Sequence, residues 1–281
     1  MICPSGGIVH LKSGTYVIDD SILLYDNMIF EGDNWTTVIK LEDYVDWPLD
    51  KVFITNANNA APPGNTNITL QNFKIDGNRA NQFHGGGSGW YNVIVFGRLN
   101  GGLITNLWII NATNDGIRLR EGCENITVSN NKMEYLGHAA IRIRDTNYIT
   151  VYNNTGHDLG NSGLRISLCQ NSNFYNNTFY NTSDAGIQLG GYSGHPLSNN
   201  NFYNNVLYHG AWGIWFSWIE ENGAQNNSFY NNIIYDHNWE GIYIHGAKNT
   251  RFINNVIYDI KAVYGTGDGI HLTNLAWDGT P

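Results

Sequence analysis

The sequence predicts a right-handed parallel β-helix, a single solenoid of about ten short coils whose strands form three short parallel sheets. A Gly-Ile or similar step recurs every 23 to 28 residues, and an Asn-Asn pair recurs in phase with it. Between these markers, apolar and polar residues alternate with a period of two, which is typical of strands. Repeats of this length indicate a solenoid, so we expect a single domain over residues 1–281.

In the N-terminal third the repeat is less regular. Strand pairs are predicted at 8–18, around Ser13-Gly14-Thr15-Tyr16, and at 67–75, and a strand is predicted at 93–96. Residues 76–92 form a long loop between strands, and long loops are often functional. We expect this loop to flank a binding groove, with His84, Trp90 and Tyr91 in the groove wall.

The central and C-terminal coils are regular. The second residue of the recurring step is in turn Gly116, Ala140, Gly163, Gly186, Gly213, Gly241 and Gly269. Steps of this size leave room for three short strands and three turns, so successive coils should stack about 4.8 Å apart. In the first of these coils the residues expected to point inward are Ile117, Leu119, Ile126, Val128 and Met133.

The Asn pairs mark one bend of every coil. They fall at 130–131, 153–154, 176–177, 204–205, 231–232 and 254–255. Asn tolerates the left-handed backbone conformation of a tight bend, and stacked amides can hydrogen-bond from coil to coil. We therefore expect a structural role for these pairs.

Composition limits the class of protein. The net charge of −9 argues against a general nucleic-acid or membrane-surface binder, and no apolar run is long enough to span a bilayer. Cys3, Cys123 and Cys169 have no metal-ligand spacing and are expected to be free thiols. Several glycosylation sequons suit an extracellular or cell-surface protein whose export signal has been removed.

The chain ends inside a coil without a polar cap. A solenoid needs its open end covered. We therefore expect the natural chain to continue beyond Pro281, or a second subunit to cover this end, for instance in a homotrimer.

Outward side chains on successive coils should line up in columns. The first column after the recurring step reads Arg118, Arg142, Arg165, Gln188, Trp215, Tyr243 and His271. Two residues further on, a second column reads Arg120, Arg144, Ser167, Gly190, Ser217, His245 and Thr273. Five arginines stacked on three coils repel one another, which predicts a bound anion. A guanidinium group fits a carboxylate or a sulfate. Pairing with surface acids such as Glu121 and Asp145 is the structural alternative.

Aromatic side chains continue the groove. Trp212, Trp215 and Tyr243 offer flat faces for sugar rings, and Glu240 lies beside them in the sequence pattern. These four residues and Trp90 are therefore predicted substrate-binding residues, together with the arginines and His157.

Acid–base candidates occupy the strand starts and one loop column. We expect Asp115, His138, His157, Asp158 and Asp184 to converge beside the arginines. Asp115, His138, Asp158 and Asp184 are the predicted catalytic residues. No cofactor is expected and the spacing of the histidines does not suit zinc, but a calcium ion near Asp158 stays an open alternative.

Across almost the whole chain the coil pattern resembles the pectin-lyase-like superfamily of right-handed β-helices. This superfamily includes pectate and alginate lyases, polygalacturonases, mannuronan epimerases and phage tailspikes. Asn114-Asp115-Gly116-Ile117 resembles the Asn-Thr-Asp-Gly segment of polygalacturonases, whose Asp is catalytic, and Gly137-His138 loosely resembles their Gly-His-Gly segment. The Asp-Asp pair and the Arg-Ile-Lys segment of that family are absent, which argues against polygalacturonase activity.

The Asn-rich coils with many Tyr and Trp residues also resemble secreted proteins of methanogenic archaea. Among these are the disaggregatases, which degrade methanochondroitin, a polymer of uronic acid and N-acetylgalactosamine. This resemblance implies an acidic matrix polysaccharide as the substrate.

These observations together predict a secreted, endo-acting enzyme that cleaves an acidic polysaccharide. Hydrolysis needs two carboxyl groups, which the three acids supply, so it is slightly favoured. β-Elimination needs a base, here Arg142 or His138, and a cation at the uronate carboxylate. C5-epimerisation on the same face and a non-catalytic carbohydrate-binding or cell-surface solenoid stay open.

Overall fold

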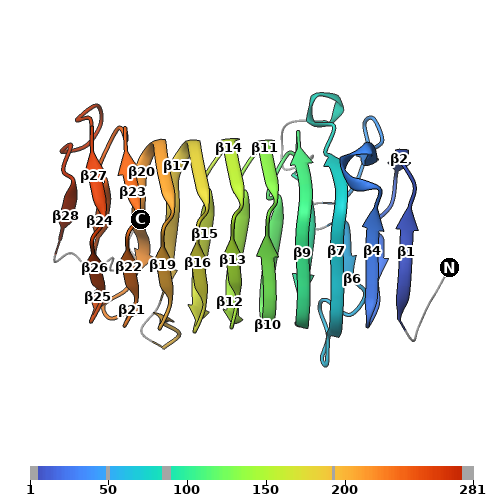
Figure 1. The fold of residues 1–281 in the computed structure, drawn as a ribbon, viewed down its shortest axis with the longest axis horizontal. Coiled ribbons are helices and arrows are strands. Elements are labelled where there is room, and N and C mark those ends of the chain that lie inside the picture. The colour runs from blue at the N-terminus through green and yellow to red at the C-terminus, as the bar shows by residue number, and fades with distance from the viewer. Residues whose placement is uncertain (1–5, 49–50, 84–89, 192–193, 274–281) are drawn as a thin grey trace.

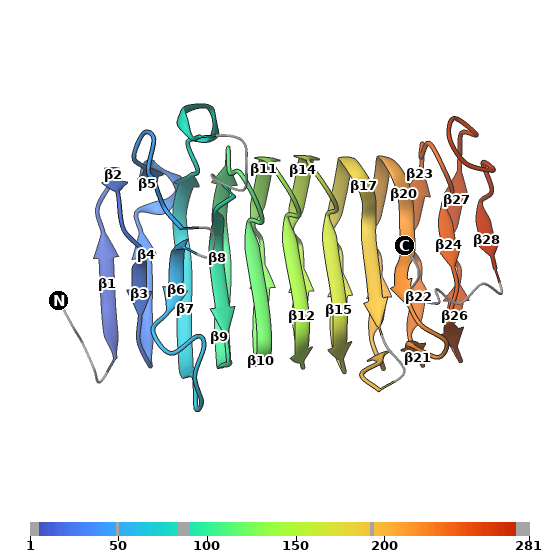
Figure 2. The ribbon, with the colours of Figure 1, turned by 180° about the vertical axis from the view of Figure 1, so that it is seen from behind.

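The computed structural model describes residues 6–48, 51–83, 90–191 and 194–273, which wind into one parallel β-helix. Its coils follow one another in chain order along the long axis of the molecule (Figures 1 and 2). Every strand pairing of the described residues is parallel, and the two helical elements among them are the 3-10 turns η1 (Asn34–Thr36) and η2 (Arg79–Asn81). The predicted fold class is confirmed.

The strand ladders define three sheets, and several long strands bend to take part in two of them. The first, which we call the groove sheet, consists of β3 (Ile22–Leu24), β6 (Val52–Asn56), β8 (Asn92–Gly97), β10 (Ile117–Ser129), β12 (Ile141–Asn147), β15 (Leu164–Gln170), β17 (Thr178–Gly191), β20 (Val206–Ile219), β24 (Ile242–Ile244) and β28 (Ile270–Leu272).

The second sheet consists of β1 (Gly7–Leu11), β4 (Met28–Gly32), β7 (Asn65–Asp76), β9 (Leu99–Ile110), β10, β13 (Thr150–Tyr152), β16 (Asn173–Tyr175), β19 (Asn201–Tyr203), β22 (Ser228–Tyr230) and β26 (Arg251–Ile253). The third sheet consists of β2 (Gly14–Ile18), β5 (Thr37–Leu41), β7, β9, β11 (Lys132–Leu136), β14 (Thr155–Leu159), β17, β20, β23 (Ile233–Tyr235) and β27 (Val256–Tyr258). A short extra ladder joins β18 (Leu197–Ser198), β21 (Ala224–Gln225) and β25 (Ala247–Lys248).

The core fills the inside of the solenoid. The five residues predicted to point inward in the first regular coil are all buried, at 0–1% exposed, and the core continues through the coils on either side. Phenylalanines stack from coil to coil within it, with ring centroids 4.8 Å apart for Phe174 and Phe202 and 4.5 Å for Phe202 and Phe229. This is the coil spacing that parallel strands impose.

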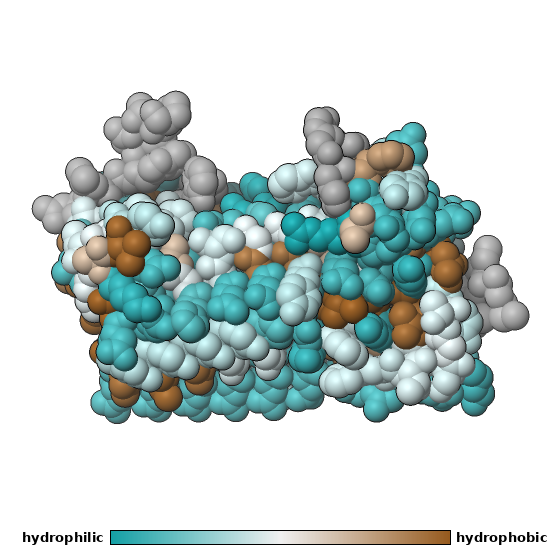
Figure 3. All heavy atoms as spheres, turned by 90° about the horizontal axis from the view of Figure 1, so that it is seen from above, coloured by the Kyte–Doolittle hydropathy of each residue, from teal (hydrophilic) through white to brown (hydrophobic). Residues whose placement is uncertain are grey.

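The two members of each Asn pair have different structural roles. The first, such as Asn176 with φ 54°, adopts the left-handed conformation and is exposed. In the five pairs from 130–131 to 231–232 the second is buried and its amide bonds to the next coil. Asn154 Nδ2 donates to Asn177 Oδ1 at 3.0 Å, and Asn177 Nδ2 donates to Asn205 Oδ1 at 3.0 Å. Figure 3 shows hydrophilic residues in rows along the long axis, as this repetition requires.

The groove wall predicted for loop 76–92 is wrong at Tyr91. Trp90 is exposed, but Tyr91 is buried and its hydroxyl donates to the carbonyl oxygens of Val45 and Trp47, at 3.1 and 3.2 Å. Tyr91 is therefore a core residue, since a buried phenol needs a hydrogen-bond partner. His84 lies outside the described residues.

Cys123 and Cys169 are buried free thiols, as predicted, and Cys3 lies outside the described residues. Within the described part of the chain, no helix is long and apolar enough to cross a membrane.

Candidate functional site

The predicted arginine column exists on the outer face of the groove sheet. Arg118 of β10 pairs in register with Arg142 of β12, and Arg142 pairs with Arg165 of β15. The column then continues through Gln188, Trp215, Tyr243 and His271, as predicted. In the companion column Arg120, Arg144, Ser167 and Gly190 also keep register.

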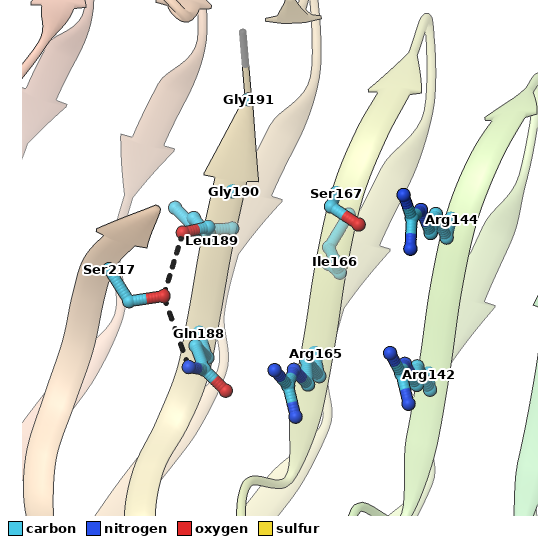
Figure 4. Close-up of a pocket in the computed structure, with 10 residues that line it drawn as sticks. All are labelled: Arg142, Arg144, Arg165, Ile166, Ser167, Gln188, Leu189, Gly190, Gly191 and Ser217. Carbon is cyan, nitrogen blue, oxygen red and sulfur yellow. Dashed lines mark hydrogen bonds between the residues drawn. The ribbon is translucent and has the colours of Figure 1, made fainter. Parts of the chain in front are cut away.

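One register prediction is wrong. Gly190 pairs with Trp218 and not with Ser217, because an irregularity after Leu189 shifts the register of β17 against β20 by one residue. Ser217 instead turns its hydroxyl toward β17, where it accepts from Gln188 Nε2 at 3.0 Å and donates to the Leu189 carbonyl at 3.3 Å (Figure 4).

The five arginines line two hollows that share Arg144. The first, of about 210 Å³, is bordered by Arg142, Arg144 and Arg165 and has a floor of small residues that includes Ser167 and Gly190. In Figure 4 the three guanidinium groups lie on one side of this hollow, with Gln188 and Ser217 opposite. The second, of about 270 Å³, is lined by Arg118, Arg120 and Arg144. We call the two together the arginine groove.

Beside the arginine groove, Asp115, His138 and Arg165 form a hydrogen-bonded chain. His138 Nδ1 lies 2.5 Å from Asp115 Oδ1, and His138 Nε2 lies 2.9 Å from Arg165 Nη1. A guanidinium group can only donate, so Nε2 accepts and Nδ1 carries the proton that is donated to Asp115. The imidazole is therefore held in one tautomer and one orientation.

Asp115 is completely buried, whereas the side chain of His138 is 17% exposed. Asp115 Oδ1 also accepts from the backbone N–H of Ala139, and Oδ2 lies 3.7 Å from Arg142 Nη1 but has no hydrogen-bond partner. Burial alone raises the pKa of this carboxyl, but the hydrogen bond from His138 and the charges of Arg142 and Arg118 outweigh it and lower the pKa. Asp115 is thus a buried carboxylate that orients His138.

Asp184 is the accessible carboxyl group of the cluster. It lies in the same corner column as His138 and Asn161, it is partly exposed, and it accepts a 2.5 Å hydrogen bond from Asn161 Nδ2. Burial raises the pKa of Asp184 above its ordinary value, although the charge of Arg165 opposes the shift. A carboxyl group with a raised pKa is suited to donate a proton.

The arginines keep unused hydrogen-bonding capacity. Arg118 Nε is buried without a hydrogen-bond partner. Burial, followed by the charge of Arg142, lowers the pKa of Arg118 and of Arg165. The predicted structural alternative holds for one pair, Arg120 Nε and Glu121 Oε1 at 3.5 Å. The remaining donors are available to an anionic ligand.

Two predicted members of the cluster lie elsewhere. His157 Nδ1 bonds Asp158 Oδ2 at 2.7 Å, and the His157 ring stacks on Tyr180 at 4.7 Å, on the outer face of the third sheet. Asp158 has φ 56° and accepts from Asn181 Nδ2 at 3.3 Å. The expected convergence with the arginines is therefore wrong for this pair, because β14 belongs to the third sheet and not to the groove sheet.

The predicted aromatic residues form an ordered cluster further along the groove sheet. Trp212 stacks on Trp215 with centroids 4.2 Å apart and planes 15° apart, and its Nε1 donates to Glu240 Oε2 at 2.7 Å. Glu240 is buried and orients Trp212. Tyr243 follows Trp215 in register and stacks on His271. Trp90 is exposed beside β8, with no described contact to this cluster.

Asn161, Gln188 and Ser217 are not among the predicted site residues. Asn161 and Gln188 stand in the predicted columns, but their residue types give no chemical signal. Within the described ranges, no group of three or more His, Cys, Asp or Glu side chains is arranged to hold a metal ion.

Proteins with different activities have solved structures with a similar fold. The A-module of a mannuronan C-5 epimerase from Azotobacter vinelandii aligns with TM-score 0.71 and 19% identity over 95% of this chain and 71% of that chain. A family 28 exopolygalacturonase from Yersinia enterocolitica aligns with TM-score 0.73 and 14% identity over 95% of this chain and 66% of that chain. A tailspike of E. coli bacteriophage HK620, in complex with a pentasaccharide, aligns with TM-score 0.72 and 15% identity over 95% of this chain and 53% of that chain.

At these identities the likeness establishes the fold. No curated protein matches the sequence. The family described as the right-handed β-helix region matches residues 50–218, which is more than half of the chain. The protein therefore belongs to the right-handed β-helix family.

Proposed function

We propose that this protein is an extracellular enzyme that acts on a uronic-acid-containing polysaccharide, with His138 as the base. The single observation that carries the proposal is the chain from buried Asp115 through His138 to Arg165 beside five arginines. A carboxylate that fixes the tautomer of an imidazole is a frequent arrangement for general-base catalysis. The surrounding cations suit an acidic sugar.

Substrate binding and release of the base are coupled in this arrangement. In the free protein Arg165 occupies Nε2 of His138. A uronate carboxylate is a stronger acceptor for a guanidinium group than a neutral imidazole. When the carboxylate accepts the hydrogen bond of Arg165 in place of His138, Nε2 becomes free to remove a proton.

The reaction that fits best is β-elimination. His138 Nε2 removes the proton from C5 of the uronate, the electron pair forms the C4–C5 double bond, and the C4–O bond breaks. Arg142 and Arg165 neutralise the charge that develops on the uronate carboxylate. Asp184, whose pKa burial raises, gives a proton to the leaving oxygen. The same proton removal followed by return of a proton to the opposite face is C5-epimerisation.

Hydrolysis is the second candidate, and Asp184 favours it. A carboxyl group with a raised pKa is the general acid that hydrolysis needs. The second carboxyl group is the difficulty, because Asp115 is completely buried and bonded to His138. Hydrolysis then requires His138, oriented by Asp115, to activate the water. A non-catalytic glycan-binding solenoid predicts that no product forms at all.

Incubation with polygalacturonate, alginate and chondroitin distinguishes these reactions. Elimination gives an unsaturated uronate that absorbs in the ultraviolet and no gain in mass, whereas hydrolysis adds one water for each cut. Epimerisation changes the NMR spectrum of the polymer and leaves its length unchanged. The size distribution of early products distinguishes endo from exo action.

The His138→Ala variant should reduce turnover by a factor of about 10³, within the range for loss of a general base. His10→Ala is the matched control, since His10 lies on β1 in the first coil, bonded to Glu31 and Asp33. Equal turnover in the two variants would contradict the assignment of His138.

A further inference from the structure

A second hollow lies at the corner of the solenoid, directly beyond the reacting groups. His138, Asn161, Asp184, Ala211 and Trp239 occupy equivalent positions on successive coils, since Asp184 N bonds the Asn161 carbonyl and Trp239 N bonds the Ala211 carbonyl. A pocket of about 340 Å³ opens where this column reaches Ala211 and Trp239. Its lining begins with Thr182 and Ser183 on the coil of Asp184 and extends over the next two coils, roughly 10 Å along the axis.

Small and polar residues line this pocket. Ala211 replaces the larger His, Asn and Asp of the preceding coils in the same column. Gly210, directly before it, also lines the pocket. Ser183 and the amide side chains of Asn181 and Asn238 add polar groups to the lining.

An ordered aromatic wall closes the far side. Trp239 lies 4.7 Å from Trp212 and 6.3 Å from Tyr264, centroid to centroid, and Tyr264 is 71% exposed. Trp212 is itself fixed by Trp215 and by the hydrogen bond to Glu240. The aromatic residues thus connect the column of the arginine groove with the corner pocket.

The charge of the pocket lining differs from that of the arginine groove. Its titratable residues are His209 and Tyr264, without a carboxylate, lysine or arginine; the other residues are small, polar or aromatic. His209 Nε2 is held at 2.6 Å from Asp236 Oδ2. Hydroxyl, amide and imidazole groups opposite an aromatic face suit the hydroxyl groups and the apolar face of an uncharged sugar.

We propose that the corner pocket binds an uncharged sugar of the same glycan whose acidic sugars bind in the arginine groove. The substrate is then a heteropolymer of acidic and neutral sugars. The extension to one glycan rests on the proposed function. The preference of the pocket for a neutral sugar rests on its own lining.

The test measures binding without turnover, using the full chain with His138→Ala. Cellobiose, lactose and N,N′-diacetylchitobiose serve as neutral probes and digalacturonate as the acidic probe, in calorimetric titrations and saturation-transfer NMR. We expect at least one neutral probe to bind and Trp239→Ala to raise its Kd roughly tenfold. Ala211→Leu, which fills the pocket without removing the aromatic wall, should weaken binding of the same probe. Neither change should affect binding of digalacturonate.

Trp35→Ala is the matched control, since Trp35 lies in the N-terminal coils beside Trp108. The proposal fails if no neutral probe binds, if Trp239→Ala and Ala211→Leu bind the probe as tightly as the parent, or if they weaken digalacturonate instead. If the protein cleaves a polyuronate but binds no neutral probe, only the proposal for the corner pocket is overturned. If a neutral probe binds in a way that depends on Trp239 but no polysaccharide is cleaved, only the proposed enzymatic function is overturned.

Discussion

The second Asn of successive pairs forms a ladder of hydrogen-bonded amides, which we call the Asn ladder. It lies on the same coils as the arginine groove, but the polar atoms of the two regions differ in hydrogen bonding. In the ladder, the amide of each member donates to the Asn of the next coil and to a backbone carbonyl, so it is fully bonded. The members are Asn131, Asn154, Asn177, Asn205 and Asn232. In the groove, Asp115 Oδ2 and Arg118 Nε have no hydrogen-bond partner.

The comparison separates stability from function. A residue that repeats in phase over every coil, such as the second Asn of each pair, satisfies its neighbours and stabilises the solenoid. A column whose residue type changes from coil to coil, such as Arg142, Arg165, Gln188 and Trp215, leaves groups for a ligand. Buried polar groups in folded proteins are usually paired, so the unpaired groups deserve the functional explanation.

Asp115→Asn should have the largest effect. The amide cannot hold His138 as the carboxylate does, so we expect kcat to fall by a factor of about 10³ with little change in KM. Steady-state kinetics on the polysaccharide identified above measure both constants. Asp259→Asn, at an exposed left-handed position, should change neither. A KM effect as large as the kcat effect would mean that Asp115 contributes to binding and not to positioning.

Asn177→Ala tests the ladder. The change leaves the Asn154 backbone N–H and the Val151 carbonyl without their side-chain partners. At about 1–3 kcal/mol for each buried unsatisfied group, we expect a loss of about 3 kcal/mol in the free energy of unfolding. The urea midpoint measures it.

The neighbouring Asn176→Gly is the control for that prediction. Asn176 is exposed and has φ 54°, which glycine adopts without strain. Its effect should stay within about 1 kcal/mol. If both variants lost the same stability, the two members of the pair would not have the different roles assigned to them.

Arg144→Ala sharpens the groove side of the comparison. Arg144 lines both hollows. The loss of one charge-assisted hydrogen bond should raise the Kd for an acidic oligosaccharide roughly tenfold. The effect should shrink at high salt, because an exposed charge is screened. Titration at two ionic strengths measures this. Arg251→Ala, on exposed β26, should leave affinity unchanged.

Asp184→Asn should have the smallest effect on the fold, and its sign is informative. Burial raises the pKa of Asp184, so the folded protein binds this proton more tightly than the unfolded chain and loses stability as pH rises through that range. Asn removes this penalty. We expect a slightly higher Tm than wild type at neutral pH, with the difference vanishing below the ordinary carboxyl pKa of about 3.9. A lower Tm at neutral pH would contradict the raised pKa.

The sequence predicted the columns because neighbouring coils are related by a nearly constant step. Arg118, Arg142 and Arg165 could therefore be placed side by side before any coordinates were known, and the structure confirms it. His157 and Asp158 were misplaced for a related reason. The repeat gives the position of a residue along a coil, but which of the three sheets it joins depends on where each strand bends.

The sequence by itself determined the solenoid, its core and the Asn ladder, because each depends on a short-range pattern repeated in phase. Only the tertiary structure decided that Asp115 is buried beneath His138, that Arg165 occupies the free imidazole nitrogen, and that Ala211 and Trp239 line one pocket. These features depend on side-chain burial and direction between coils. A periodic pattern specifies which residues are neighbours, but not which atoms of those neighbours meet.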